Sequence, residues 1–300
     1  MNQSDAKARY NSGLLAAIGT YLIWGVAPLY WQLLKPASAP EILAHRVIWS
    51  VGLLLIIVYF RNLMVEVRSA SNDKRKILLL FSASILISIN WGVFIWAVNN
   101  GHVIETSLGY FINPLVSVAL GVFILKEKLS SPQKVSVALT FIAVTFLTLT
   151  LGHPPYIALS LAFSFGFYGL VKKILNMNAI SSLTLETLLL TPFFLAFLFY
   201  LNSKDQLSFV NYDLNHSFWL AIAGVVTVVP LLLFGTAVVR IPLVVLGLVQ
   251  ALGPILQFLL GYFVFNEPMS LARWIGFLIV WLAVTVFSYD AVKTYRENKN

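Results

Sequence analysis

The sequence has 300 residues, of which 59% are hydrophobic and only 11% are charged, and it contains no cysteine. A soluble domain carries about 25% charged residues, which cover its surface, so this composition excludes an ordinary soluble protein. The lack of cysteine excludes disulfides, thiolate metal sites and cysteine nucleophiles. With a mean hydropathy of +0.85, the chain is predicted to be an integral membrane protein.

Ten apolar segments follow one another along the chain, each of roughly 20 residues, which is the length needed to cross a bilayer core of about 30 Å. They occupy residues 13–34, 41–60, 77–98, 103–125, 133–151, 155–175, 181–201, 217–238, 243–265 and 271–290. The short breaks between them leave no room for a soluble domain. A membrane barrel would instead show alternating segments of about ten residues. The sequence therefore predicts an all-α integral membrane protein with ten transmembrane helices.

The basic residues are distributed unevenly between the two ends of these helices. If the N-terminus is cytoplasmic, the cytoplasmic side holds Lys7, Arg9, Arg61, Arg68, Lys74, Arg75, Lys76, Lys126, Lys128, Lys134, Lys172, Lys173, Arg240, Lys293, Arg296 and Lys299. The outer side holds only Lys35, Lys204 and Arg273, and Arg46 lies within a helix. This positive-inside bias predicts cytoplasmic N- and C-termini. It also accounts for the net charge of +8 without a nucleic-acid partner.

An internal repeat relates the two halves of the chain at an offset of 140 residues. The matched positions include residue types that are uncommon in apolar helices: Pro114 with Pro254, Gly121 with Gly261, Glu127 with Glu267 and Ser130 with Ser270. Each half, residues 1–151 and 152–300, holds five predicted crossings. Because five is an odd number, the halves must be inserted in opposite senses. Inverted repeats of this kind are typical of secondary transporters.

The fourth helix of each half carries small and polar residues on one face. In the first half they are Thr106, Tyr110, Asn113, Ser117 and Gly121, and in the second half the matched positions are Leu246, Gln250, Gly253, Gln257 and Gly261. Such a stripe is consistent with close packing between helices and also with the lining of a solute pathway. Pro114 and Pro254 lie at mid-span, where each frees a backbone carbonyl and favours a kink.

Few ionisable residues lie inside the predicted helices, and each of them needs a partner there. Arg46 lies in the second helix beside His45, and Glu41 is one turn from His45 on the same face. Glu105 begins the fourth helix near the outer surface. Glu186 lies in the seventh helix, at the position that matches Arg46 in the repeat. Arg46 is either a substrate-anion site or gate, or it is part of a buried structural pair or snorkels to the outer headgroups.

Aromatic residues are frequent both at the ends and at the centres of the predicted helices. Trp31, Trp219 and Trp274 lie near helix ends, where tryptophan anchors a protein at the membrane interface. The deeper set is Trp24, Trp91 and Tyr168, together with the amide of Asn90. A cavity of aromatic side chains with a few amides suits a modest-sized, partly apolar solute.

Motifs that would indicate chemistry are missing from the sequence. It has no Gly-x-x-x-x-Gly-Lys-Ser/Thr loop, so the chain is not its own ATPase. It has neither a Gly-x-Ser-x-Gly elbow nor a His-Glu-x-x-His motif. We therefore expect no enzymatic activity, no cofactor and no metal site.

Five strings in the sequence are distinctive. They are YLIWG at 21–25, EILAHRVIWS at 41–50, FIWAVNN at 94–100, SLGYFINPL at 107–115 and FSFGFYGLVKK at 163–173. In these strings the chain resembles the RarD-type branch of the EamA family, within the drug/metabolite transporter superfamily, over nearly its whole length. The resemblance implies a ten-helix inverted-repeat fold and a permease of the bacterial inner membrane, of a kind often labelled as chloramphenicol-resistance related.

We hypothesise a secondary transporter that moves a small organic solute, such as a metabolite, an amino-acid-like compound or a drug like chloramphenicol, as the two halves rock around a central cavity. The predicted pathway residues are Trp24, His45, Arg46, Asn90, Trp91, Tyr110, Asn113, Tyr168, Gln250 and Gln257. Glu105, Glu186 and His45 are candidates for proton coupling. The expected partners are this solute and membrane lipid. The alternative is a lipid-handling protein, either a scramblase or a lipid-modifying enzyme, whereas the short loops argue against a receptor or an assembly subunit.

Overall fold

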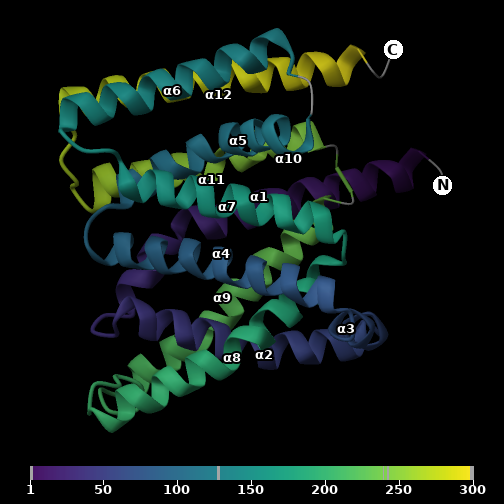
Figure 1. The fold of residues 1–300 in the computed structure, drawn as a ribbon, viewed down its shortest axis with the longest axis vertical. Coiled ribbons are helices and arrows are strands. Elements are labelled where there is room, and N and C mark those ends of the chain that lie inside the picture. Colours follow the sequence, from purple (N-terminus) through teal and green to yellow (C-terminus); the bar gives the residue numbers. More distant parts are fainter. Residues whose placement is uncertain (1–2, 127–128, 239, 242, 298–300) are drawn as a thin grey trace.

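The computed structural model describes residues 3–126, 129–238, 240–241 and 243–297. Within these ranges every regular element is helical (Figure 1). The elements are α1 (Gln3–Leu33), α2 (Ala39–Phe60), α3 (Met64–Ser71), α4 (Lys74–Asn99), α5 (Val103–Leu125), α6 (Ser131–Leu151), α7 (Tyr156–Leu175), α8 (Ala179–Ser203), α9 (Leu214–Val238), α10 (Leu243–Gln250), α11 (Leu252–Leu259), the π-helical turn η1 (Leu260–Val264) and α12 (Leu271–Glu297). The prediction of an all-α fold is confirmed.

These helices are consistent with ten crossings of a bilayer. In the described part of the chain, nine helices are long and apolar enough to span a membrane, and the shorter apolar stretch Leu248–Val264 supplies the tenth crossing. The start of α1 and the end of α12 lie at the same end of the bundle (Figure 1), as an even number of crossings requires. The hydropathy pattern does not predict α3, which has only 8 residues. The chain is a multi-pass membrane protein.

Local sequence signals explain where several helices begin. The hydroxyl of Ser38 accepts a hydrogen bond from the first turn of α2, and the carboxylate of Asp73 does the same for α4. Ser130 and Gln133 form a reciprocal capping box at the start of α6. These caps matter because the first N–H groups of a helix have no acceptor within the helix itself.

The two mid-span prolines have different effects on their helices. α5 continues through Pro114 without a break. The matched segment of the second half is predicted as one helix over 243–265, but it is divided into α10, α11 and η1, with the break at Ala251 just before Pro254. The N–H of Ala251 bonds to the carbonyl of Leu248, three residues earlier, at 3.3 Å. Proline has no N–H to donate to the preceding turn, which allows the helix to break at this point.

The most extensive helix contacts join one half of the chain to the other. α4 and α5 both pack on α7, α1 and α2 both pack on α9, α2 packs on α8, and α6 packs along α12. Under the repeat, each of these helix pairs corresponds to another helix pair that is also in contact. The contact between α1 and α9 corresponds to that between α7 and α4, and the contact between α5 and α7 corresponds to that between α11 and α1. In Figure 1, α6 and α12 lie side by side as an outer layer of the bundle. The two halves therefore interlock instead of forming separate bundles.

Glycine permits the closest of these approaches. A Cβ on Gly224 of α9 would lie 2.6 Å from a backbone carbon of Trp49 in α2, and one on Gly261 of η1 would lie 2.6 Å from the side chain of Ile104 in α5. Both distances are shorter than real Cβ contacts, so these helices can approach only where no side chain is present. At Gly261 the small-residue stripe therefore serves helix packing.

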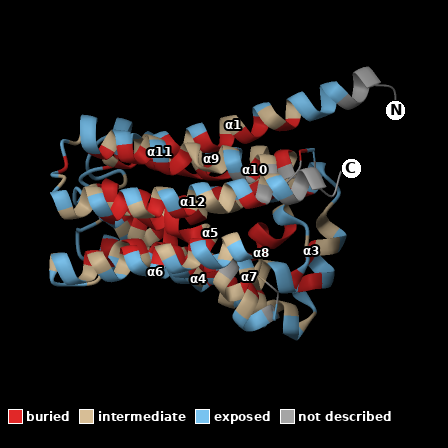
Figure 2. Ribbon diagram, turned by 90° about the horizontal axis from the view of Figure 1, so that it is seen from above, coloured by how far each residue is buried: buried red, intermediate tan, exposed pale blue. Residues whose placement is uncertain are grey.

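Burial distinguishes the inner faces of the helices from the outer ones. Buried residues lie along the faces between helices, and exposed residues lie along the outside (Figure 2). The exposed residues include large apolar side chains such as Phe141, Leu149 and Phe199. A continuous apolar exterior of this kind suits contact with lipid tails. The first turns of α1 project beyond the rest of the bundle (Figure 2).

Candidate functional site

Arg46 is the central residue of the candidate site and lies near the start of α2. It is buried, with only 6% of its surface exposed. The guanidinium carbon lies 3.8 Å from the ring centre of Trp91 in α4 and 5.0 Å from that of Trp31 in α1. A cation over the face of a tryptophan is attracted by the charge distribution of the ring, most strongly where water is excluded. Two tryptophans therefore hold this positive charge inside the bundle.

The charge of Arg46 has no counter-ion in the described part of the chain. No ion pair there includes it, and its buried Nε has no hydrogen-bond partner. Tyr30 of α1 and Tyr110 of α5 are close enough to interact with it electrostatically. A buried cation without a partner is costly, because water no longer solvates it and no carboxylate compensates. Arg46 is therefore the polar group of the site that most needs a ligand.

His45 and Glu41 do not meet on α2 as their spacing suggested. The ring of His45 packs against Phe209, with 4.6 Å between the ring centres, and its Nε2 has no hydrogen-bond partner among the described residues. The carboxylate of Glu41 instead accepts hydrogen bonds from the N–H and the hydroxyl of Ser208, each at 2.8 Å. Glu41 thus fixes the loop before α9 and is not available to Arg46.

Asn90 and Tyr110 form a hydrogen-bonded group next to Trp91. The amide nitrogen of Asn90 donates to the carbonyl of Leu161 at 3.0 Å and to the hydroxyl of Ser164 at 3.1 Å. The hydroxyl of Tyr110 donates to the amide oxygen of Asn90 at 3.3 Å. These bonds connect α4 to α5 and α7, and they give the mid-helix amide of Asn90 the partners that it needs inside a membrane.

A row of polar side chains runs along α7 from this group. Ser164, Tyr168 and Lys172 are spaced four residues apart, so they share one face of the helix. Ser164 bonds to Asn90, whereas Tyr168 and Lys172 bond to Glu186 of α8. The row therefore leads from the neighbourhood of Arg46 toward the last turn of α7.

Glu186 is fully buried and has three donors around its carboxylate. Lys172 donates at 2.7 Å, Ser182 at 2.7 Å and Tyr168 at 3.0 Å. Although the repeat relates Glu186 to Arg46, the two residues do not pair with each other. The negative charge of Glu186 is neutralised within the second half of the chain.

Three further predicted residues lie around the broken helix of the second half. The amide nitrogen of Gln257 donates to the carbonyl of Trp24 at 3.2 Å, while its amide oxygen has no partner within the described residues. The carbonyl of Pro254 accepts a hydrogen bond from Ser107 of α5 at 2.7 Å. Gln250 is the last residue of α10 and is half-buried. These contacts hold α1, α5 and α11 together where the helix breaks.

Asn113 belongs to none of these groups. It is buried in α5, and its amide oxygen accepts a hydrogen bond from Ser117, one turn later on the same helix, at 3.4 Å. The structure therefore brings Arg46, Asn90, Trp91 and Tyr110 together and places Tyr168 beside Glu186. Among the described residues, the partner of Asn113 lies on its own helix.

Two carboxylates bind helix starts at one end of the bundle. Glu105 accepts a hydrogen bond from the N–H of Ile157 in α7 at 3.3 Å. Glu267, in the loop before α12, accepts hydrogen bonds from the N–H groups of Val103 and Ile104 in α5. Burial raises the pKa of Glu267, and the two backbone donors oppose that shift. Glu127, its match in the repeat, lies outside the described residues.

Comparison with known proteins identifies the family. A model of the EamA-like transporter family matches the chain twice, over residues 11–149 and 155–289. The chain belongs to the EamA-like transporter family. The resemblance carried by the five sequence strings is therefore confirmed.

Two relatives of this EamA-like chain are similar over nearly their whole length. Protein RarD of Streptomyces exfoliatus is 45% identical over 294 residues, which cover 98% of this chain and 93% of that protein. The uncharacterized transporter YojE of Bacillus subtilis (strain 168) is 42% identical over 299 residues, which cover 98% of this chain and 99% of that protein. A solved crystal structure has a similar fold, with a TM-score of 0.53 at 13% identity, covering 93% of this chain and 98% of that chain.

The structure corrects the interpretation of Trp31. Its place near a helix end predicts an interface anchor, which is wrong, because only 2% of the residue is exposed and its ring lies over Arg46. In this EamA-like fold α1 continues to Leu33 and packs on α9, α11 and α4, so the ring faces the bundle interior. Position along a helix does not show which face a residue occupies.

Sequence reasoning also missed the role of Lys172. Its basic charge is predicted only to lie on the cytoplasmic side, but its side chain is 22% exposed and is paired with Glu186. The signal in the sequence is the four-residue spacing of Ser164, Tyr168 and Lys172, which places a lysine on the polar face of α7.

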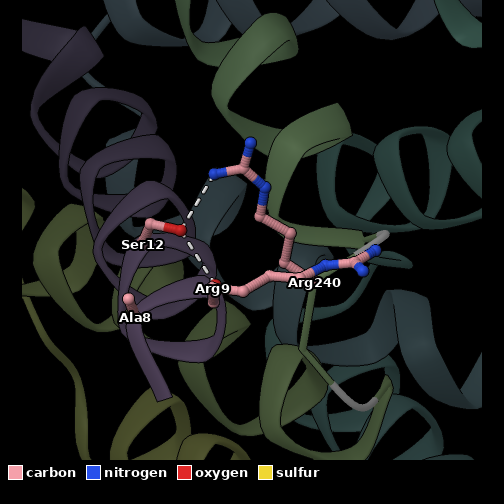
Figure 3. Close-up of a pocket in the computed structure, with 4 residues that line it drawn as sticks. All are labelled: Ala8, Arg9, Ser12 and Arg240. Carbon is pink, nitrogen blue, oxygen red and sulfur yellow. Dashed lines mark hydrogen bonds between the residues drawn. The ribbon is translucent and has the colours of Figure 1, made fainter. Parts of the chain in front are cut away.

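Two hollows lie at the ends of the bundle, and Arg46 lines neither of them. The wider one, about 520 Å³, is open and is lined by Ala8, Arg9, Ser12 and Arg240 (Figure 3). There Arg240 donates a hydrogen bond to the hydroxyl of Ser12 at 2.9 Å. The smaller one, about 30 Å³, lies near the start of α5 and includes Glu105 and Arg273. Arg46, buried within the bundle, is therefore separate from both hollows.

Proposed function

We propose that this protein is a secondary transporter, which moves a small organic solute across the membrane by alternating access and without ATP. The observation that carries the proposal is the buried Arg46, which lies over Trp91 and near Tyr110, the residue that bonds to Asn90 at the start of the polar row along α7. Buried polar and charged groups are costly in a membrane and mark solute or ion pathways. Membership of the EamA-like transporter family and the transporter name of one relative support the same function.

The interlocked halves bear on how the transporter moves. Because α1, α2 and α4 pack more extensively on helices of the second half than on each other, residues 1–151 and 152–300 are poor candidates for two rigid bodies. We therefore assign the motion to units that each contain helices of both repeats. The break between α10 and α11 adjoins α1 and α5, and broken helices near the bilayer centre are typical of transporter sites.

The proposed location is the bacterial inner membrane, with both termini in the cytoplasm. Two observations support this orientation: the excess of basic residues at one set of helix ends, and the presence of the α1 start and the α12 end on the same side (Figure 1). In this orientation Arg46 lies toward the outer side, and the row along α7 leads to the cytoplasmic end.

A proton is the coupling ion that we propose, with Glu105 as its carrier. Glu186 is the poorer candidate, because its carboxylate is held by Lys172, Ser182 and Tyr168 and a proton would have to disrupt that group. Within the described part of the chain Glu105 accepts a single hydrogen bond, and it adjoins a hollow at the end of the bundle. Solute flux that is unchanged when the proton gradient is collapsed would contradict this assignment.

Comparative metabolite profiling tests the proposed function. Cells that produce the protein are compared with cells that carry the empty vector, and solutes are measured in the medium and in the cytoplasm. We expect a small organic solute to change its distribution. The purified protein in liposomes should not accelerate the transfer of a fluorescent phospholipid between leaflets. Lipid transfer without solute movement would assign the protein to lipid handling instead.

A single introduced cysteine tests alternating access. The natural sequence has no cysteine, so Ser164→Cys introduces a single thiol next to Asn90 with little change in volume. A membrane-impermeant maleimide should label it from each side of the membrane in turn, with rates that the transported solute shifts in opposite directions. Ser203→Cys at the exposed end of α8 is the matched control, and it should be labelled from one side only.

A further inference from the structure

We propose that the solute carries a carboxylate and that Arg46 binds this group, with the aromatic side chains around it contacting an apolar body. This inference rests on the proposed transport function and adds the chemical class of the substrate.

The guanidinium group of Arg46 has donors that a carboxylate can use. The ring centres of Trp91 and Trp31 lie 3.8 Å and 5.0 Å from the guanidinium carbon, and the buried Nε of Arg46 has no hydrogen-bond partner among the described residues. The N–H donors of arginine form a planar fork, and contacts with aromatic rings do not satisfy them as an oxygen acceptor would. The guanidinium therefore retains donors for a ligand, and a carboxylate is the group that matches two of them at once.

The charge balance around Arg46 points to a ligand with a single negative charge. Among the described residues Arg46 has no ion pair, and Glu41, five residues earlier on α2, is bound to Ser208. One buried positive charge is compensated by one negative charge. A carboxylate carries that charge, whereas a phosphate monoester carries about −1.5 to −2 and would leave an excess of buried negative charge.

The internal repeat shows which charge the first half lacks. Glu186 occupies the position in the second half that matches Arg46, and it is compensated by Lys172. The position that matches Lys172 in the first half is Gln32, whose amide donates to the carbonyl of Val98 at 3.2 Å. The first half therefore lacks a charged residue at the place where the second half has its counter-ion, and a ligand would supply the missing charge.

The surroundings of Arg46 indicate what else the solute contains. Besides the two tryptophans, the core here includes Tyr30, Tyr110 and Phe94, with the rings of Phe94 and Tyr110 5.7 Å apart. The hydroxyl of Tyr110 is bound to Asn90 and that of Tyr30 to the carbonyl of Trp219. Because these polar groups already have partners, the walls around the charge are largely apolar. An aromatic or aliphatic carboxylate fits such a site.

The test extends the metabolite profiling to three variants made in equal amounts. Arg46→Gln removes the charge, Arg46→Lys keeps it without the paired donors, and Arg61→Gln removes an exposed arginine at the other end of α2. We expect the transported solutes to be carboxylates. Their movement should fall by roughly tenfold or more in Arg46→Gln, less in Arg46→Lys, and not at all in Arg61→Gln.

The outcomes separate this inference from the function on which it rests. If the unaltered protein moves neutral or cationic solutes, or if Arg46→Gln moves the same carboxylates at the same rate, the inference is wrong and the transport function stands. If the unaltered protein is inserted and moves no solute, both fail.

If the Arg46→Gln variant does not accumulate in the membrane, the inference is tested by binding of the carboxylate to the unaltered protein. The profiled carboxylate should raise the unfolding temperature of the purified protein, and the methyl ester of the same compound should not. Equal stabilisation by acid and ester would overturn the inference.

Discussion

Positions 46 and 186 are related by the internal repeat, yet their charges are treated in opposite ways. Arg46 is enclosed by two tryptophans and has no counter-ion among the described residues, whereas Glu186 accepts hydrogen bonds from a lysine, a serine and a tyrosine. The same place in two copies of one fold thus holds an open charge in one half and a compensated charge in the other. An internal duplication supplies symmetric positions, and in this chain the charges at the two positions have different surroundings.

The partner positions explain this difference. Glu186 is bound by Tyr168, Lys172 and Ser182, and the matched residues of the first half are Pro28, Gln32 and Ile42. None of these three carries a negative charge that could pair with arginine. The difference between the two halves is therefore already present in their sequences. The residues that decide it lie four to eighteen positions before Arg46 in the first half and before Glu186 in the second half.

The largest effect on stability is expected when Glu186 loses its counter-ion. Lys172→Met keeps the length of the side chain but removes the counter-ion of Glu186, which should lower the free energy of unfolding by about 3–5 kcal/mol. Arg46→Met strands no carboxylate, so it should change stability by only about 1 kcal/mol or less. Both are measured by denaturant unfolding of the purified proteins in the same detergent.

The double variant Lys172→Met with Glu186→Gln is the control for that comparison. It removes both charges and should recover most of the lost stability, because neutral residues of similar size replace a buried ion pair at little cost. If Arg46→Met proved as destabilising as Lys172→Met, the distinction between an open and a compensated charge would not hold.

A smaller effect on stability is expected when Arg46 is given a counter-ion from the protein itself. Gln32→Glu places a carboxylate at the position that matches Lys172, where it can pair with Arg46. We expect the free energy of unfolding to rise by about 1–2 kcal/mol. Solute movement should be lost, because the carboxylate of the variant then binds Arg46 in place of the solute. The control Gln32→Met removes the hydrogen bond to Val98 without adding a charge. A Glu variant no more stable than the Met variant, or one with undiminished solute movement, would argue against the assignment.

The smallest effect concerns the rings around Arg46. Phenylalanine attracts a cation less strongly than tryptophan, so Trp91→Phe should weaken the contact by about 0.5–1 kcal/mol. A double-mutant cycle with Arg46→Met isolates this energy from the packing change, because only the coupling between the two side chains survives the subtraction. A coupling energy of zero would mean that Trp91 contributes only volume to the site.

The predicted site residues differ in how well local sequence places them. Asn90 and Trp91 are neighbours in the chain, and the spacing of polar residues predicts the helix face on which Tyr110 lies. The sequence therefore predicts approximately that these three residues lie close together. The direction of the Trp31 ring and the pairing of Lys172 are not predicted, because hydropathy gives a residue a depth along the helix but not a direction around it. The rotation of α1 and α7 depends on which helices they pack against.

The two mid-span prolines show the same limit. Both are visible in the sequence, at matched positions, and both predict a kink. α5 continues through Pro114, whereas the matched segment is divided into α10 and α11 before Pro254. The carbonyl of Pro254 finds a donor in Ser107 of α5, a contact between the halves that no local pattern contains.

The sequence by itself determined the membrane-spanning character, the ten apolar segments and the repeat, because hydropathy and residue identity act over single helices and need no knowledge of their neighbours. Only the tertiary structure decided which charges are paired, which aromatic rings face Arg46 and which helices of opposite halves interlock. These features depend on the rotation and crossing of helices far apart in the chain. In a membrane, packing and hydrogen bonding between helices determine that arrangement, because lipid tails leave little hydrophobic force to do so.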